Sequence, residues 1–392
     1  MELTEAFTGL ECTACGGRFE ATEPGRCPDC GSPLDPSYDY DAVDADALAA
    51  AAGGSMWRFE DVLPFARPAA VSVAEGGTPT VSAPALAEDL GVGSVLLKDE
   101  GRNPTGSVVD RGLALAVTAA AERGLEPLAL AAAGNAGQSA ATYAGRAGLR
   151  SYAFVPSRAP FTNKAMVNVH GGQMRVAGGR YPDAVAAQDD LETEWHSLQE
   201  FTSPYRHEGA KTLAYELVAD RGWEAPDAVV VPDATGELVV GVVKGLRELA
   251  TLGLIDETPP VYAAQAEGCA PLAAAWERDG ETVEPWEHPD TIAGELEIPD
   301  PAGGDLALAA LRETDGGVVA VDDPDLLEAA VDATERTGVE VGPAGGAGIA
   351  AVEAVVDDLP ADASAATVAV VNPATGATTA DVLRSHLMSK GV

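Results

Sequence analysis

Basic residues, and lysines above all, are scarce in this chain. Its 392 residues include 24 lysine and arginine residues against 62 aspartate and glutamate residues, which gives a formal net charge of −38 at pH 7. A surface with this charge repels the phosphates of nucleic acids and the headgroups of anionic lipids. The composition therefore argues against nucleic acid and membranes as partners.

Long apolar runs are also absent. No run approaches the roughly 20 apolar residues that a membrane helix needs, and residues 1–5 carry no basic side chain. We therefore expect a soluble, cytoplasmic protein without a signal peptide. A hydrophobic content of 46% is sufficient for two lobes and a small accessory module.

The acidic residues are spread along the chain and are not gathered in one tail. Examples are residues 39–46, 189–190 and 322–323. Scattered acid with little lysine resembles the proteins of haloarchaea, in which a high internal salt concentration screens the self-repulsion. We therefore expect a halophilic protein.

Cysteine is limited to five residues, and four of them form two Cys-x-x-Cys-Gly motifs, at residues 12–16 and 27–31. Two motifs with this spacing place four thiolates around one tetrahedral Zn²⁺ ion. Disulfides are the rival interpretation, which a cytoplasmic setting disfavours. We predict a structural zinc ribbon over residues 1–36, with the ligands Cys12, Cys15, Cys27 and Cys30. We interpret the fifth cysteine, Cys269, as a small core residue.

Apolar strands and helical segments alternate from about residue 95 onward. Strands are predicted at residues 95–97, 128–132, 151–156, 229–232 and 369–371, and helices at residues 138–147 and 238–249. Another helix is predicted to follow an N-cap at Ser107. Alternation at this spacing predicts an α/β protein with mostly parallel sheets.

The segment from Lys98 to Gly112 reads Lys-Asp-Glu-Gly-Arg-Asn-Pro-Thr-Gly-Ser-Val-Val-Asp-Arg-Gly. It resembles the Schiff-base segment of threonine synthase, a pyridoxal-phosphate (PLP) enzyme of the tryptophan-synthase-β fold type. Where that family has Phe-Lys, this chain has Val108 and Val109. The resemblance implies a two-lobed PLP fold type II. In it, residues 37–100 and 206–392 form the large lobe, and residues 101–205 form the small lobe.

Further segments match the family along nearly the whole chain, at residues 75–80, 134–137, 208–212, 233–237, 292–296, 341–347 and 375–376. The resemblance implies that Asn135 faces the ring hydroxyl of PLP, that Gly236 remains from a glycine-rich phosphate loop, and that Thr375 faces the pyridine nitrogen. Two carboxylates, Asp233 and Glu237, stand in or beside the phosphate loop. An unpaired like-charge contact at ~4 Å costs about 4 kcal/mol at an effective dielectric constant near 20.

The position of the family's catalytic lysine is the main departure. In the family that lysine holds PLP and moves the α-proton of the substrate, and Val109 can do neither. The chain has five lysines, namely Lys98, Lys164, Lys211, Lys244 and Lys390. Lys211 lies in the segment that borders the family's cleft, so it is either the lysine that replaces the missing amine or a surface or salt-bridged lysine.

Two functional interpretations follow. In the first, the chain is a degenerate threonine-synthase-like paralogue without Schiff-base catalysis and without a catalytic residue. It then has a regulatory role or binds a small amino-acid-like ligand, as a homodimer or together with an active paralogue. In the second, it is an active threonine synthase or a related PLP-dependent lyase acting on a phosphorylated or hydroxy amino acid. Zinc is the expected structural cofactor in both, and the resemblance implies PLP.

Overall fold

A computed structural model describes residues 2–22, 25–190, 195–359 and 363–391. The chain divides into two compact units. The first comprises Met1–Gly77, Val109–Glu216 and Lys244–Asp256, and the second comprises Thr78–Val108, Leu217–Val243 and Glu257–Val392. These ranges are not those of the two lobes predicted above, whose limits stay a prediction.

The first unit begins with a small antiparallel sheet in the order β2-β1-β3. Its strands are β1 (Phe7–Cys12), β2 (Arg18–Phe19) and β3 (Leu34–Tyr38). In this sheet Leu10 pairs with Phe19, and Cys12 pairs with Leu34. The helix α1 (Ala45–Ala50) and the short 3-10 turns η1 (Tyr40–Ala42), η2 (Met56–Val62) and η3 (Arg67–Ala69) follow.

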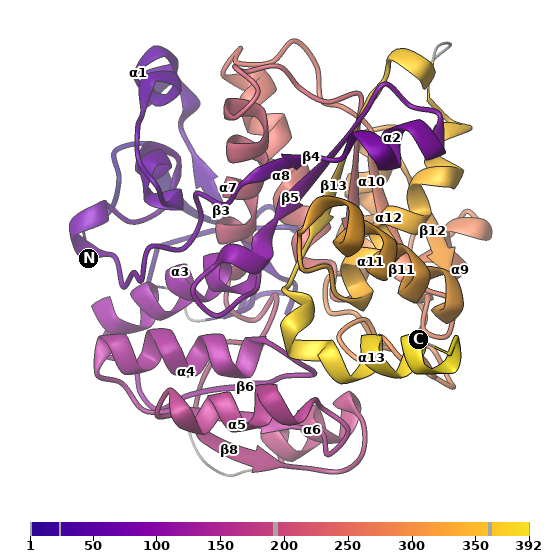
Figure 1. Ribbon diagram of the computed structural model, residues 1–392. Helices are drawn as coiled ribbons and strands as arrows, with labels where there is room; N and C mark the ends of the chain where they lie inside the picture. Colours follow the sequence, from indigo (N-terminus) through magenta and orange to yellow (C-terminus); the bar gives the residue numbers. More distant parts are fainter. Residues whose placement is uncertain (1, 23–24, 191–194, 360–362, 392) are drawn as a thin grey trace. The chain divides into compact units, whose positions relative to one another are not determined.

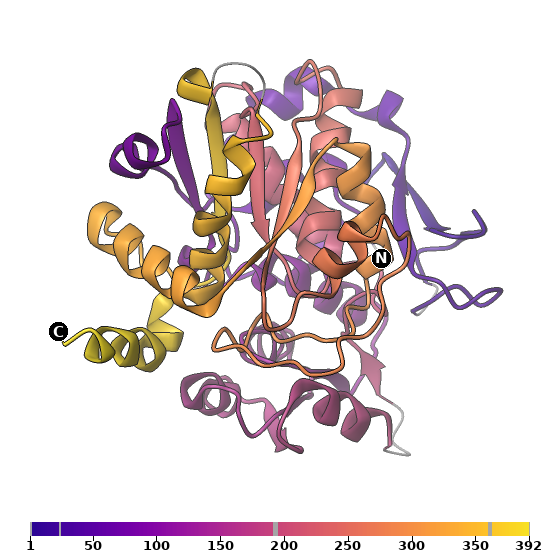
Figure 2. The ribbon, with the colours of Figure 1, turned by 90° about the vertical axis from the view of Figure 1, so that its right-hand side faces the viewer.

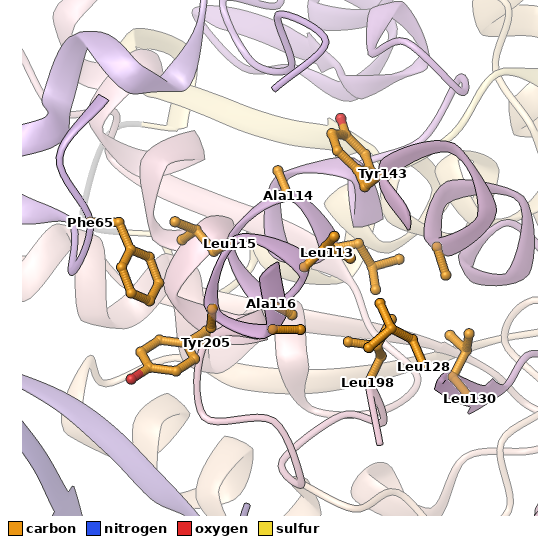
Figure 3. Packing of buried hydrophobic residues seen from close by; sticks show 14 of the residues in the cluster. Phe65, Leu113, Ala114, Leu115, Ala116, Leu128, Leu130, Tyr143, Leu198 and Tyr205 are labelled. Carbon is orange, nitrogen blue, oxygen red and sulfur yellow. The ribbon is translucent and has the colours of Figure 1, made fainter. Parts of the chain in front are cut away.

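A four-stranded parallel sheet, in the order β8-β7-β6-β9, forms the second layer of the first unit. Its strands are β6 (Leu128–Ala131), β7 (Ser151–Val155), β8 (Gln173–Val176) and β9 (His196–Ser197). Its helices are α3 (Val109–Glu122), α4 (Ala136–Ala147), α5 (Phe161–Val169) and α6 (Tyr181–Asp189). Leu128 and Leu130 point to the core formed with α3 and α4 (Figure 3), whereas Ala129 and Ala131 face α6. The alternation follows from the period of two along a strand.

The second unit contains a six-stranded sheet in the order β12-β11-β10-β13-β5-β4, whose strands run side by side in Figures 1 and 2. The strands are β4 (Thr80–Ser82), β5 (Ser94–Asp99), β10 (Ala228–Pro232), β11 (Val261–Ala266), β12 (Gly317–Val321) and β13 (Thr367–Asn372). All pairs are parallel except β4 with β5. Because parallel strands are buried on both faces, β10 and β11 are apolar along most of their length.

Helices α2 (Pro84–Leu90), α11 (Asp323–Thr337) and α12 (Pro343–Val356) pack against one face of this sheet. The other elements are α9 (Pro271–Glu277), α10 (Gly304–Glu313), α13 (Ala380–Ser389), η4 (Glu100–Arg102), η5 (Ala363–Ala365) and η6 (Gly376–Thr379). Two helices, α7 (Arg206–Ala219) and α8 (Glu237–Thr251), contribute residues to both units.

The predicted fold class is confirmed, and the predicted strands correspond to β5, β6, β7, β10 and β13. The predicted start of the helix after Ser107 is wrong by one residue, because α3 begins at Val109 and not at Val108. Ser107 pairs instead with Ala374 in a β-bridge, and the N–H of Val108 donates to the carbonyl of Pro373 at 2.8 Å. Among the described residues, none of the helices combines the length and apolar character that a membrane span requires.

Candidate functional site

Four cysteines near the N-terminus lie close together. The Sγ atoms of Cys12 and Cys30 are 3.4 Å apart and those of Cys15 and Cys27 are 3.8 Å apart, and all four lie within 4.8 Å of one another. Four sulfurs bonded at about 2.3 Å to one tetrahedral zinc ion would lie about 3.8 Å from one another. The sulfur positions therefore fit the closed four-ligand site that the sequence predicts.

Each cysteine motif turns at its glycine. Gly16 and Gly31 have φ angles of +68° and +77°, which lie in the left-handed region that glycine adopts without strain. Their N–H groups donate to the carbonyls of Cys12 and Cys27 and close the two turns. Hydrogen bonds from Ser32 lower the pKa of the Cys30 thiol to about 6, which favours the thiolate that binds a metal ion.

Strand β3 leads from the cysteine motifs into a cluster of charged and phenolic side chains, most of them buried. We call this set the buried ionic cluster. Its members are Asp35, Tyr38, Tyr40, His207, Glu208, Lys211, Tyr215, Lys244 and Glu248. They come from β3, from the turn after it and from α7 and α8.

Lys211 lies at the centre of the buried ionic cluster and is fully buried. Its Nζ atom forms ion pairs with Glu208 and, at 3.0 Å, with Glu248, and it lies 4.0 Å from the centre of the Tyr38 ring. Burial raises the pKa of Glu248 more than Lys211 lowers it. Lys211 is therefore a structural cation in this unit. The sequence left both a site role and a salt-bridged role open for Lys211, and the structure shows the salt-bridged one, with Glu208 three residues before Lys211 as in helical ion pairs.

Lys244 joins the same cluster to the ribbon. Its Nζ atom lies 2.6 Å from carboxylate oxygens of Asp35 and of Glu208. Burial alone would raise the pKa of Asp35, but Lys244 and His207 outweigh it and hold that pKa well below its usual range. Asp35, His207 and Glu208 also lie close enough to share a metal ion. Since lysines already neutralise both carboxylates, we interpret this group as an ion-pair network.

Val109 is the first residue of α3 and is half-buried against the apolar core of the first unit. The charged residues that follow it are held by partners of their own. Asp110 accepts a hydrogen bond from Ser139 at 2.5 Å, and Arg111 forms a two-point ion pair with Glu216 at 2.7 and 2.8 Å. The charged residues after Val109 are therefore held in place by hydrogen bonds and an ion pair, although Val109 itself has no amine.

All five lysine amines have acceptors. Lys98 is fully buried, donates to the carbonyl of Thr78 at 2.6 Å and pairs with Asp220 at 3.6 Å. Lys390 pairs with Glu328. Lys164 has the weakest restraint of the five. Among the described residues, its amine contacts only the backbone carbonyl of Ser157, at 2.7 Å.

Asn135 immediately precedes α4. Its side-chain carbonyl accepts a hydrogen bond at 2.7 Å from the amide of Asn163, which is buried on α5. This hydrogen bond orients the Asn135 side chain. Its NH₂ group donates to no acceptor among the described residues. Asn163 could not be recognised from the sequence, since a lone asparagine 28 residues away from Asn135 carries no local signal.

Gly236 lies in the turn between β10 and α8 and has a φ of +85°. A Cβ atom on it would lie 2.4 Å from the carbonyl oxygen of Gly303, so both the conformation and the close approach require glycine. In the same turn, Oδ2 of Asp233 accepts from the N–H of Gly236 at 2.8 Å, and Oδ1 accepts from Val239 at 3.3 Å. Asp233 is 2% exposed, and burial raises its pKa to about 6.

Thr375 caps the short turn η6. Its hydroxyl donates to Oε2 of Glu340 at 2.7 Å and accepts from the N–H of Ala377 at 3.3 Å. Of the predicted cofactor residues, Asn135 belongs to the first unit, with Val109, whereas Gly236 and Thr375 belong to the second. Their assignment to PLP stays a prediction.

Comparison with known proteins gives consistent matches over most of the chain. A family model described as "Pyridoxal-phosphate dependent enzyme" matches residues 71–373. The chain is 33% identical to the threonine synthase of Methanosarcina acetivorans over 353 residues, which is 89% of this chain and 87% of that protein. It is 31% identical to the threonine synthase of Methanocaldococcus jannaschii over 354 residues, which is 88% of this chain and 87% of that protein.

Solved structures share the fold. Maize serine racemase matches with a TM-score of 0.66 at 21% identity, covering 80% of this chain and 94% of that chain. An L-serine ammonia-lyase from Rhizomucor miehei matches with a TM-score of 0.68 at 22% identity, covering 81% of this chain and 99% of that chain. The fold thus defines an α/β protein of the PLP fold type II class. Within that class, the chain belongs to the threonine synthase family of PLP-dependent enzymes.

Proposed function

We propose that this chain is a degenerate member of the threonine synthase family that carries out no Schiff-base catalysis with PLP. The observation that carries the proposal is Val109, which stands where the family has its lysine. A saturated hydrocarbon side chain can neither bind the cofactor covalently nor accept the α-proton of a substrate. The chain then acts as a regulatory or ligand-binding protein, and an amino-acid-like molecule is the expected ligand.

The distribution of the lysines supports this proposal. Lys98 and Lys211 are fully buried and ion-paired, so their amines are not available to an aldehyde without breaking those contacts. Lys244 is likewise bound to two carboxylates. None of these three lysines therefore fits PLP as a covalently held group.

An active PLP enzyme is the second candidate, and one observation favours it. Lys164 is held only by the carbonyl of Ser157 among the described contacts, and it follows Asn163, the partner of Asn135, in the sequence. If the family's amine has moved, Lys164 is the residue that we would examine first.

We also propose that the four cysteines bind one structural Zn²⁺ ion. The supporting observation is that the four sulfurs come within 4.8 Å of one another with all four ligands supplied by the protein, which leaves no open position for a substrate. As partners we propose a second copy of the chain or an active paralogue.

The test is reduction with borohydride after addition of PLP, in high salt, followed by peptide mapping. We expect no yellow absorbance band and no PLP-modified peptide in stoichiometric amount. The variant Lys164→Met is the matched control, because it removes the least restrained amine without touching the buried ion pairs. A stoichiometric adduct on one lysine of the unmodified protein, together with formation of threonine from O-phosphohomoserine, would overturn the proposal.

A further inference from the structure

The turn between β10 and α8 contains an acidic side chain at the position where the resemblance implies a phosphate. We propose that the carboxylate of Asp233 is an internal substitute for that phosphate, so that the ligand of this chain carries no phosphate group. This inference rests on the proposed function in one respect, namely that the chain binds a ligand. Its own evidence comes from Asp233, which belongs to the second unit, whereas the proposed function is argued from Val109 in the first unit.

The hydrogen bonds of the turn support this inference. The first N–H groups of a helix have no partner within the helix and are the usual donors to a bound anion. Here, Asp233 accepts from Gly236 at 2.8 Å and from Val239 at 3.3 Å, and it also accepts from the backbone of Leu238. The remaining group in this series, the N–H of Glu237, donates to the hydroxyl of Thr235 at 3.3 Å. The donors that would bind a phosphate are thus already bound to the protein.

The backbone of the turn is fixed independently of any ligand. The N–H of Gly303 donates to the carbonyl of Thr235 at 2.9 Å, and the N–H of Asp233 donates to Ala264 on β11 at 3.0 Å. The close approach of Gly236 to Gly303 leaves no space for a side chain at that position. Because both ends of the turn are held, the N–H groups point to the Asp233 carboxylate whether or not a ligand is present.

Electrostatic repulsion also disfavours a phosphate in this turn. A phosphate that entered the turn would meet the carboxylate of Asp233 among the donors that it needs, and the nearby charge of Glu237 as well. Like charges repel, and the surroundings of a buried site screen that repulsion poorly. A ligand without a phosphate does not meet this repulsion.

The experiment compares the wild type with Asp233→Gly, which frees the N–H groups without adding a side chain. Inorganic phosphate is the probe, and potassium chloride at equal ionic strength is the reference, because an acidic protein is also stabilised by salt in general. We expect phosphate to raise the melting temperature of the wild type only by the gradual, non-saturable increment that kosmotropic anions give to proteins in general. We expect Asp233→Gly to melt lower in chloride and to recover saturably with phosphate, with at least a tenfold gain in phosphate affinity.

Asp322→Gly is the matched control. Asp322 caps α11 by accepting from Asp325 at 2.8 Å, but it is exposed to solvent. Its loss should lower the melting temperature without creating a phosphate response. Asp233→Ala is the second variant in case the glycine variant does not fold, and it should gain phosphate affinity because it removes both the charge and the acceptor of the N–H groups in the turn.

Saturable stabilisation of the wild type by phosphate over chloride would refute the inference, and so would a folded Asp233→Gly or Asp233→Ala protein that gains no affinity for phosphate. Neither result bears on Val109. The proposed function fails separately, if the wild type forms a stoichiometric PLP adduct on a lysine. The two ideas can therefore fail independently.

Discussion

Replacing Lys211 with methionine tests whether the buried ionic cluster is the structural feature that the contacts indicate. The change keeps much of the side-chain volume and removes the charge. Glu208 keeps its ion pair with Lys244 at 2.6 Å, whereas Glu248 loses its contact with Lys211 and keeps only hydrogen bonds from Tyr40 and Tyr215, each at 2.8 Å. Glu248 then becomes a buried carboxylate without a direct ion pair, and the charge of Lys244 is the cationic charge that still acts on it.

Removal of one partner of a buried ion pair costs about 3–5 kcal/mol. Because Glu208 retains Lys244, we expect Lys211→Met to lower the free energy of unfolding by about 3 kcal/mol, at the lower end of that range. Burial already raises the pKa of Glu248, and loss of Lys211 raises it further. The neutral form of Glu248 then favours the folded state, and this contribution is lost as the pH rises through the folded-state pKa. The cost of the substitution should therefore be larger at alkaline pH than at acidic pH.

The assay is urea unfolding at one fixed, high concentration of potassium chloride. Lys390→Met is the matched control, since Lys390 pairs with Glu328 where both side chains are about half exposed, and its removal should cost less than about 1 kcal/mol. The double variant Lys211→Met with Glu248→Gln should recover a large part of the loss, because it no longer buries an unpaired charge. A cost for Lys211→Met no larger than that of the control, or strict additivity in the double variant, would refute the reasoning.

Three further predictions concern zinc, salt and pH. Elemental analysis should find about one zinc per chain, and Cys15→Ser should lower both the zinc content and the melting temperature; protein that folds equally well without metal would contradict the zinc assignment. With a formal net charge of −38, the melting temperature should rise as potassium chloride increases from ~0.1 M, and indifference to salt would count against a halophilic protein. Burial raises the pKa of Asp233 from 3.8 to about 6, so its neutral form stabilises the fold below pH 3.8, and this contribution, about 3 kcal/mol, is lost as the pH rises through 6. The free energy of unfolding of Asp233→Asn, measured with urea, should therefore rise relative to that of the wild type between about pH 4 and pH 7. If the difference between the two proteins is the same at every pH, Asp233 does not titrate as a buried carboxyl.

Sequence and structure agree where the physical cause is local. The Cys-x-x-Cys-Gly spacing brings Cys12 and Cys15, and likewise Cys27 and Cys30, to one end of a tight turn, and glycine at positions 16 and 31 permits the left-handed turn. Buried parallel strands are continuous apolar runs, so β10 and β13 could be placed from composition alone. The absence of an amine at Val109 is likewise a property of the sequence and needs no structure.

The tertiary structure alone decided which polar groups meet. Asp35 and Lys244 are 209 residues apart, and Tyr38 and Glu208 are 170 residues apart, yet they form one buried ionic cluster. No local periodicity encodes such pairs, because they depend on how β3 packs against α7 and α8. The start of α3 at Val109 has the same origin, since Ser107 pairs with Ala374 and the N–H of Val108 donates to Pro373, and both residues therefore stay outside the helix.

Asp233 illustrates both the contribution of the sequence and that of the tertiary structure. The sequence by itself determined that residue 233 is an acid; its resemblance to the family implies a glycine of a phosphate loop at this position, which predicts repulsion of an anion. Only the tertiary structure decided that the carboxylate turns inward and accepts the hydrogen bonds of the helix start. The physical reason is that a buried N–H group must find an acceptor, and the fold holds this turn so that its nearest acceptor is the protein's own acid.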